Sequence, residues 1–170
     1  QVNAAVNACL VEAVLELLDP QARETVLDLF CGVGNFTLPL PRQAARVVGM
    51  EGNAALVQRA RANAVHNEIM NADFREVDLY REATPIAWDE LRFDKLLLDP
   101  PRSGAMEAIK QLPRTHLPSR IVYVSCYPAT LARDSEYLVR ALGFCLLSAG
   151  IADMFPHTSH MEAIAVFTRD

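Results

Sequence analysis

The stretch TVLDLFCGVGNF, residues 25–36, is the strongest indication of the fold. It joins a strand-like apolar run to a turn with two glycines. Gly32 and Gly34 let the backbone turn tightly and approach a ligand closely. Thr37 stands where the dinucleotide fingerprint GxGxxG has its third glycine, and that fingerprint serves a pyrophosphate at a helix N-terminus. The loop therefore argues against NAD and permits a ligand without a phosphate.

Outside this stretch, strand-like and helical patterns alternate along the chain. The apolar runs occupy residues 25–30, 46–50, 73–77, 93–98, 120–124, 145–152 and 164–168. Helical spacing occupies residues 4–18, 37–44, 54–66, 105–112 and 129–142. This alternation predicts an α/β fold with a mostly parallel, doubly wound sheet of seven strands. The loop between the last two runs is too short for a parallel crossover, so the final strand is expected to be antiparallel to its neighbour.

Two carboxylates flank the glycine turn and suggest what it binds. Asp28, just before the turn, suits a cationic or amine-bearing ligand better than a phosphate. Glu51 ends the second run, where a carboxylate can accept both hydroxyls of a ribose. The alternative is a tight turn without a ligand. Together the residues favour a nucleoside-type cofactor, and S-adenosylmethionine carries both an amine and a sulfonium.

Three polar motifs are expected to meet at the carboxyl edge of the sheet, where ligands bind in open α/β folds. They are DPPR at 99–102, SCYP at 125–128 and the loop 155–162. Cys126 precedes a predicted helix, and a helix N-terminus favours the thiolate form that a nucleophile needs. Its alternative is a buried structural cysteine. Glu162 is a candidate general base or a solvated carboxylate.

The other cysteines give no sign of a metal site. None of the four has a partner at CxxC spacing, so no metal is predicted. Cys9 and Cys145 lie in apolar periodic segments and are expected to be small buried hydrophobes, while Cys31 is expected to be mainly structural. Nothing indicates an oxidising compartment, so a cytoplasmic location is expected.

Four polar residues near these motifs keep two interpretations each. His157 and His160 either contact the substrate or pack and cap within their loop. Arg133 and Asp134 form an ion pair on a helix surface or contact RNA.

A cysteine, a base and a methyl donor at one edge suit the methylation of carbon 5 of uracil. Carbon 5 is a poor nucleophile until a thiolate adds to carbon 6 and creates an enolate. The methyl group is then transferred, a base removes the proton on carbon 5, and the thiolate is eliminated. The target base must leave its stack to enter such a pocket.

The motifs, taken in order, resemble those of the RNA uracil-5-methyltransferase family over nearly the whole chain. They are QVN at 1–3, residues 28–36, DPPR at 99–102, SCxP with Arg133 and Asp134, and FPxTxHxE at 155–162. Residues 29–40 and 153–162 are most similar to bacterial members that act on 23S rRNA, and tRNA-modifying members are the alternative. The resemblance implies a Rossmann-like class I S-adenosylmethionine-dependent methyltransferase.

The resemblance also implies site residues. Cys126 is the implied nucleophile and Glu162 the implied base. The implied cofactor contacts are Gln1, Phe30, Asn35, Glu51, Asp78 and Asp99. Two positions depart from the family pattern, because Tyr127 replaces an Asn after the nucleophile and Asp78 stands where the 23S rRNA members have an Asn.

Charge and domain content bear on the partners. The net charge is −5, whereas an RNA-binding protein usually has a basic surface. Family members carry upstream RNA-binding domains, and the rRNA enzyme an iron–sulfur cluster, so residues 1–170 are interpreted as a single catalytic domain from the C-terminal part of a longer protein. The chain is expected to bind S-adenosylmethionine and to methylate RNA poorly alone. Its expected partners are rRNA with a flipped uridine and the upstream domains, not DNA or a membrane.

Two other functions remain open. An amino-group methyltransferase could use the DPP sequence at 99–101 and would not need Cys126. A non-catalytic module that binds S-adenosylmethionine or a partner protein would form no covalent adduct.

Overall fold

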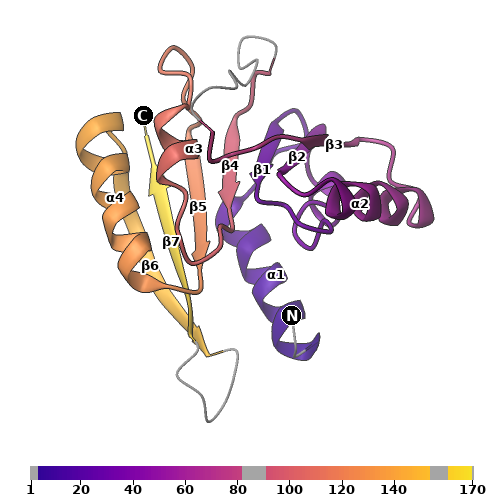
Figure 1. Ribbon diagram of the computed structural model, residues 1–170, viewed down its shortest axis with the longest axis horizontal. Coiled ribbons are helices and arrows are strands. Elements are labelled where there is room, and N and C mark those ends of the chain that lie inside the picture. Colours follow the sequence, from indigo (N-terminus) through magenta and orange to yellow (C-terminus); the bar gives the residue numbers. More distant parts are fainter. Residues whose placement is uncertain (1–3, 82–90, 154–160, 170) are drawn as a thin grey trace.

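A computed structural model describes residues 4–81, 91–153 and 161–169, and within them seven strands form one sheet in the order β3-β2-β1-β4-β5-β7-β6 (Figure 1). The strands are β1 (Thr25–Leu29), β2 (Arg46–Glu51), β3 (Ala72–Glu76), β4 (Lys95–Leu98), β5 (Arg120–Ser125), β6 (Cys145–Asp153) and β7 (Met161–Thr168). The helices are α1 (Ala4–Leu18), the short 3₁₀ helix η1 (Leu40–Arg42), α2 (Ala54–His66), α3 (Met106–Lys110) and α4 (Pro128–Leu142).

The strand directions confirm the predicted sheet. Strands β1 to β5 pair in parallel, and β7 inserts between β5 and β6, antiparallel to both. The chain runs outward from β1 to β3 and then crosses back to β4 on the other side of β1. In an open sheet this reversal of strand order opens a crevice at the carboxyl ends.

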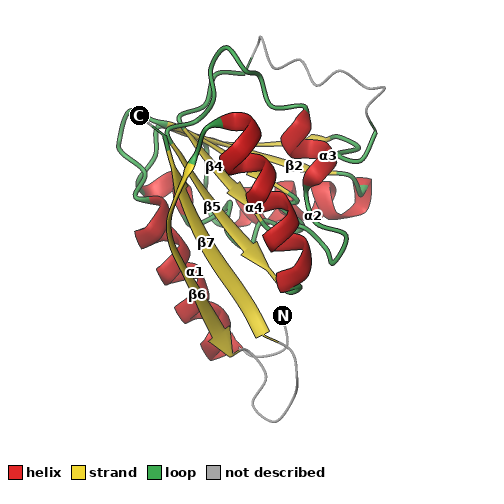
Figure 2. Ribbon diagram, turned by 90° about the vertical axis from the view of Figure 1, so that its left-hand side faces the viewer, coloured by secondary structure: helices red, strands yellow, loops and turns green. Residues whose placement is uncertain are grey.

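Helices cover both faces of the sheet (Figure 2). Alternate residues of the central strands belong to two cores, as the two-residue period of a strand requires. One core packs the sheet against α3 and α4, and the other packs it against α1 and the 3₁₀ segment. A third cluster joins α2 to β3 through Val57, Ala60 and Phe74.

The predicted helix at residues 37–44 is wrong in its extent. The structure has turns up to Pro39 and then only η1. The reason is the sequence Pro39-Leu40-Pro41: prolines remove backbone donors and disfavour the α-helical conformation of the preceding residue. The remaining predicted helices and strands are present, with ends that differ by up to three residues.

The expectation that Cys9 and Cys145 are buried is also wrong, because both are exposed. The buried residues of α1 begin at Leu10 and follow a stripe that excludes Cys9. Cys145 begins β6, which is the edge strand of the sheet. Periodicity alone could not separate an edge strand from an internal one.

No helix in the described part of the chain is long and apolar enough to cross a bilayer.

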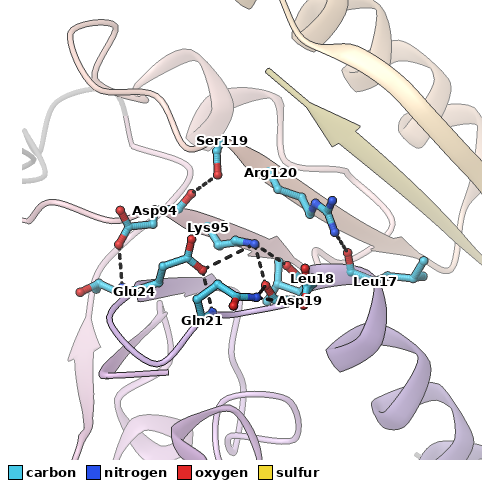
Figure 3. A network of polar contacts seen from close by, with 10 residues as sticks. Leu17, Leu18, Asp19, Gln21, Glu24, Asp94, Lys95, Ser119 and Arg120 are labelled. Atoms are coloured by element: carbon cyan, nitrogen blue, oxygen red, sulfur yellow. Dashed lines mark hydrogen bonds and ion pairs between the residues drawn. The ribbon is translucent and has the colours of Figure 1, made fainter. Parts of the chain in front are cut away.

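A buried lysine fastens the C-terminus of α1 to the sheet (Figure 3). The Lys95 ammonium donates to the carbonyl oxygens of Leu18 at 3.1 Å and Asp19 at 2.7 Å, and lies 3.5 Å from the Glu24 carboxylate. Arg120 donates to the carbonyl of Leu17 at 3.0 Å. The Leu18 carbonyl is among those that a helix C-terminus leaves without partners, so the lysine satisfies a buried group, whereas the exposed Asp19 carbonyl also accepts from Gln21.

Replacement of Lys95 with methionine is expected to lower the free energy of unfolding by about 2–3 kcal/mol, because it leaves the buried Leu18 carbonyl without its lysine donor and Glu24 without its ion-pair partner. Arg140→Met is the matched control. Its i,i+4 pair with Glu136 is 80% and 63% exposed, so a change below about 0.5 kcal/mol is expected. Urea titration followed by circular dichroism measures both, and equal losses would contradict the role given to Lys95.

Candidate active site

Three of the predicted cofactor residues meet at the carboxyl edge of the sheet. Strand β1 pairs with β2 on one side and with β4 on the other. The residue that follows the last pair is Phe30 after β1, Glu51 at the end of β2 and Asp99 after β4. Phe30 has a φ of 65°, the left-handed region that non-glycine residues rarely adopt. The chain turns at this residue from β1 into the glycine loop.

The same edge holds a pocket of about 390 Å³. Its walls come from the ends of β1, β2 and β4 and from the segment after β3, and consist of Phe30, Glu51, Gly52, Asp78, Leu79, Tyr80, Asp99, Pro100 and Pro101. The pocket therefore brings together Phe30, Glu51, Asp78 and Asp99. It also contains Tyr80, which the sequence analysis missed although an aromatic residue two positions after a rim carboxylate was a usable signal.

Backbone amides orient the carboxylates of the pocket. Glu51 accepts N–H groups of Gly32 at 3.2 Å and Asn53 at 2.9 Å, and Asp78 accepts the N–H of Tyr80 at 3.1 Å. The rings of Phe30 and Tyr80 contact each other with centroids 5.7 Å apart. Aligned acceptors beside an aromatic surface suit a nucleoside, whose hydroxyls donate and whose base is flat.

Asp28 is fully buried on β1, two residues before the pocket residue Phe30. The Thr37 hydroxyl donates to its Oδ2 at 2.5 Å, whereas no residue in the described ranges provides a partner for Oδ1. Burial raises the pKa of Asp28 to about 8, with Asp99 and Glu51 adding to the rise and Thr37 opposing it. Burial and Glu162 raise the pKa of Asp99 to about 7. A positively charged ligand would favour the ionised form of these carboxyl groups, whose pKa values are raised.

Cys126 and Glu162 come together through the antiparallel pairing of β5 and β7. Ser125 pairs with Ala163, so the next residue on β5 lies beside the preceding residue on β7. Cys126 is partly exposed and Glu162 partly buried. The negative charges of Glu162 and Asp99 both raise the pKa of the Cys126 thiol. The three side chains are therefore close enough to interact electrostatically.

The expected lowering of the thiol pKa is wrong. Burial raises the pKa of Cys126, and the negative charges of Glu162 and Asp99 raise it further. The Cys126 backbone hydrogen bond and the positive charge of Arg102 lower the pKa but do not outweigh these effects. Burial also raises the pKa of Glu162. A base must therefore take the thiol proton before the sulfur can act as a nucleophile.

The second cysteine at this edge has a packing role. Cys31 is 6% exposed, and burial raises the pKa of its thiol above the ordinary range. A Cβ at Gly49 would lie 2.9 Å from the Cys31 sulfur, so glycine makes room for it. The two cysteines thus differ in access to solvent, and Cys126 is the one that lies beside Glu162.

Asn35 lies apart from the pocket. Its amide exchanges two hydrogen bonds with Asn7 of α1, at 2.9 and 3.1 Å. It borders two larger hollows of about 750 and 790 Å³ on the flanks of the loop 33–43. We place the site at the smaller pocket, because the carboxylates of Glu51, Asp78 and Asp99 line it together. The cofactor role of Asn35 stays a prediction, and Gln1, His157 and His160 lie outside the described residues.

Tyr127 is 48% exposed beside the candidate nucleophile. The Ser125 hydroxyl accepts the N–H of Tyr127 and donates to its carbonyl, each at 3.1 Å. Ser125 thereby closes the turn that leads into α4, independently of the side chain at position 127.

The whole chain, residues 1–170, matches the family model for tRNA (Uracil-5-)-methyltransferase. It is 57% identical over 169 residues to the 23S rRNA (uracil(1939)-C(5))-methyltransferase RlmD of Stenotrophomonas maltophilia, covering 99% of this chain and 38% of that protein. The RlmD of Thiobacillus denitrificans is 56% identical over 170 residues, covering 99% of this chain and 39% of that protein. The chain thus spans less than half the length of these curated relatives.

A solved structure is also similar. The tRNA (uracil-54, C5)-methyltransferase of Pyrococcus abyssi, in complex with S-adenosyl-L-homocysteine, superposes with a TM-score of 0.79 at 32% identity, over 99% of this chain and 39% of that one. The fold is that of the S-adenosylmethionine-dependent methyltransferases. With the match over its entire length, the chain belongs to the tRNA (uracil-5-)-methyltransferase family.

Proposed function

We propose that this domain transfers a methyl group from S-adenosylmethionine to carbon 5 of a uridine in RNA, and that the RNA is 23S rRNA. The observation that carries the proposal is the placement of Cys126 beside Glu162 and next to a pocket rich in carboxylates. The curated relatives with 56–57% identity support the rRNA. The family description and the Pyrococcus structure favour tRNA as the second candidate.

The residues present fit the cofactor. Glu51 and Asp78 offer oriented acceptors for ribose hydroxyls, and Phe30 and Tyr80 offer aromatic surface for the adenine. The carboxylate of Asp99 lines the pocket and suits the positively charged end, and it interacts electrostatically with the buried Asp28, whose Oδ1 has no partner among the described residues. When bound, S-adenosylmethionine supplies an electrophilic methyl group.

Cys126 and Glu162 have separate roles in the reaction. A base removes the proton of Cys126, and the sulfur forms a bond to carbon 6 of a uridine that has left its stack. The electron pair of the double bond moves to carbon 5, which would take the methyl group as the bond between that group and the sulfonium sulfur breaks, leaving S-adenosylhomocysteine. Glu162 takes the proton from carbon 5, and the carbon–sulfur bond breaks as the carbon 5–carbon 6 double bond returns. Burial raises the pKa of Glu162, which makes it a stronger base for this step.

Affinity for S-adenosylmethionine is expected to weaken at least about tenfold as the pH falls from 9 to 6. A cation binds best when Asp28 and Asp99 are ionised, and with pKa values of about 8 and about 7 both become protonated over this interval. Isothermal titration calorimetry measures the effect. S-adenosylhomocysteine, which lacks the sulfonium charge, should show a smaller dependence. Equal slopes for the two ligands would contradict a charge-based role.

The substrate is tested with unmodified transcripts of 23S rRNA and tRNA, incubated with excess protein and labelled S-adenosylmethionine. Mass spectrometry of the nucleosides should find 5-methyluridine, with more in the rRNA. A label on amino groups instead would support the alternative that uses the DPP sequence at 99–101. No label, combined with no cofactor binding, would overturn the proposal.

RNA binding is proposed to depend on the remainder of the protein. The net charge of −5 gives this chain little attraction for phosphates. It should therefore bind the cofactor but turn over RNA slowly, and the proposed place of action is the cytoplasm. Turnover by this chain that equals that of a longer form would contradict this division of roles.

A further inference from the structure

Asp134, near the start of α4, is a fully buried carboxylate outside the pocket. Its Oδ2 accepts the backbone N–H of Ala105 and the hydroxyl of Tyr123, both at 2.7 Å. Its Oδ1 accepts from the guanidinium of Arg133, with Nη2 at 2.7 Å and Nε at 2.8 Å. The predicted ion pair is thus confirmed, but its carboxylate is in the interior and not on the helix surface. A buried carboxylate with this many donors fixes the position of each of them.

Arg133 and Asp134 also hold the loop 101–105 in place. Arg133 donates to the carbonyl of Ser103 at 2.9 Å. Gly104 has a φ of 83°, and a Cβ there would lie 2.6 Å from both Arg133 Nη2 and Asp134 Oδ2. Glycine is required at this position both by the backbone conformation and by the closeness of the ion pair. The loop and the first turns of α4 therefore form one packed unit.

This loop joins the two halves of the site. Just before it, Asp99 and Pro100 line the pocket with Pro101. Within it, the charge of Arg102 acts on the Cys126 thiol, and the Ser103 hydroxyl lies 2.9 Å from the hydroxyl of Tyr80. A displacement of the loop would disturb the alignment of the nucleophile with the cofactor.

We infer that Asp134 and Arg133 are positioning residues, which clamp the loop 101–105 so that the cofactor pocket and Cys126 keep a productive alignment. The inference rests on the proposed function for its catalytic consequence. Neither residue touches the reacting atoms, since both act through Ser103, Gly104 and Ala105.

Asp134→Asn is expected to slow methyl transfer in a single turnover about 10- to 100-fold, since small misplacements of reacting groups cost rates of this size. The dissociation constant for S-adenosylmethionine should change less than about threefold, because Glu51 and Asp78 stay anchored by their own strands. Arg133→Gln, at a side chain that is 48% exposed, tests the same clamp if the buried variant folds poorly. Glu136→Gln removes a charge from the same helix without touching the loop and should leave both quantities unchanged.

Iodoacetamide alkylation of Cys126, followed peptide by peptide across pH, supplies a readout that needs no RNA. If Asp134 acted only through its charge, removal of that negative charge would lower the pKa of the Cys126 thiol. If Asp134 holds the loop 101–105, its loss lets Arg102 move away from Cys126 and the pKa of the thiol rises. Alkylation at pH 8 should then slow at least about twofold. Unchanged alkylation and an unchanged single-turnover rate in folded Asp134→Asn and Arg133→Gln would overturn the clamp. Failure of the wild type to methylate would instead count against the proposed function.

Discussion

Cys126→Ala is expected to abolish methyl transfer, with a loss of at least about 1,000-fold, and to prevent any covalent complex with RNA. Carbon 5 of uracil is not nucleophilic until a sulfur adds to carbon 6, and among the described cysteines Cys126 is the one placed beside Glu162 and Asp99. Affinity for S-adenosylmethionine should stay within about twofold, because Cys126 does not line the pocket of Phe30, Glu51 and Asp99. Single-turnover assays and calorimetry measure the two quantities.

Cys145→Ala is the matched control for that variant. Cys145 is exposed on the edge strand β6, away from the carboxyl edge of β4 and β5, and its loss should leave the rate unchanged. If Cys126→Ala retained activity within tenfold of the wild type, the amino-group chemistry of the DPP sequence would replace the present mechanism.

Glu162→Gln is expected to separate two steps that the wild type performs in succession. Release of methylated product should fall at least about 100-fold, because the proton on carbon 5 has no acceptor. The covalent complex between Cys126 and RNA should accumulate, since sulfur addition precedes this proton transfer. Denaturing gel electrophoresis measures the complex, and nucleoside mass spectrometry measures the product.

The same variant should make Cys126 more reactive toward iodoacetamide at pH 7 to 8. Glu162 is the largest of the charges that raise the pKa of the thiol, so its neutralisation lowers that pKa. Glu136→Gln, an exposed carboxylate on α4, should have no effect. Equal alkylation of Cys126 in Glu162→Gln and the wild type would show that the two side chains do not interact.

The sequence predicted the sheet because its strands are short apolar runs between turns. The same reasoning predicted the meeting of Cys126 and Glu162. A strand that returns after a short loop must run antiparallel, and the pairing of β5 with β7 then places the ends of both at one edge. The cofactor pocket followed from parallel strands that end together at Phe30, Glu51 and Asp99.

The features that escaped prediction depend on contacts distant in the sequence. The raised pKa of Cys126 comes from burial and from the carboxylates of Glu162 on β7 and Asp99 after β4, which outweigh the Cys126 backbone hydrogen bond and the charge of Arg102. The clamp of Asp134 joins α4 to a loop about 30 residues earlier. The contact between Tyr80 and Phe30 joins two segments about 50 residues apart, so only the position of Tyr80 after Asp78 pointed to it in the sequence.

The most direct test is the incubation of this chain with RNA that contains 5-fluorouridine, in the presence of S-adenosylmethionine. Fluorine at carbon 5 cannot leave as a proton, so elimination of the sulfur is blocked and the adduct persists. We predict a protein–RNA complex that survives denaturation, carries one transferred methyl group, maps to the peptide with Cys126 and is lost in Cys126→Ala. A methylated RNA that forms without any bond to Cys126, or a bond to another residue, would contradict it.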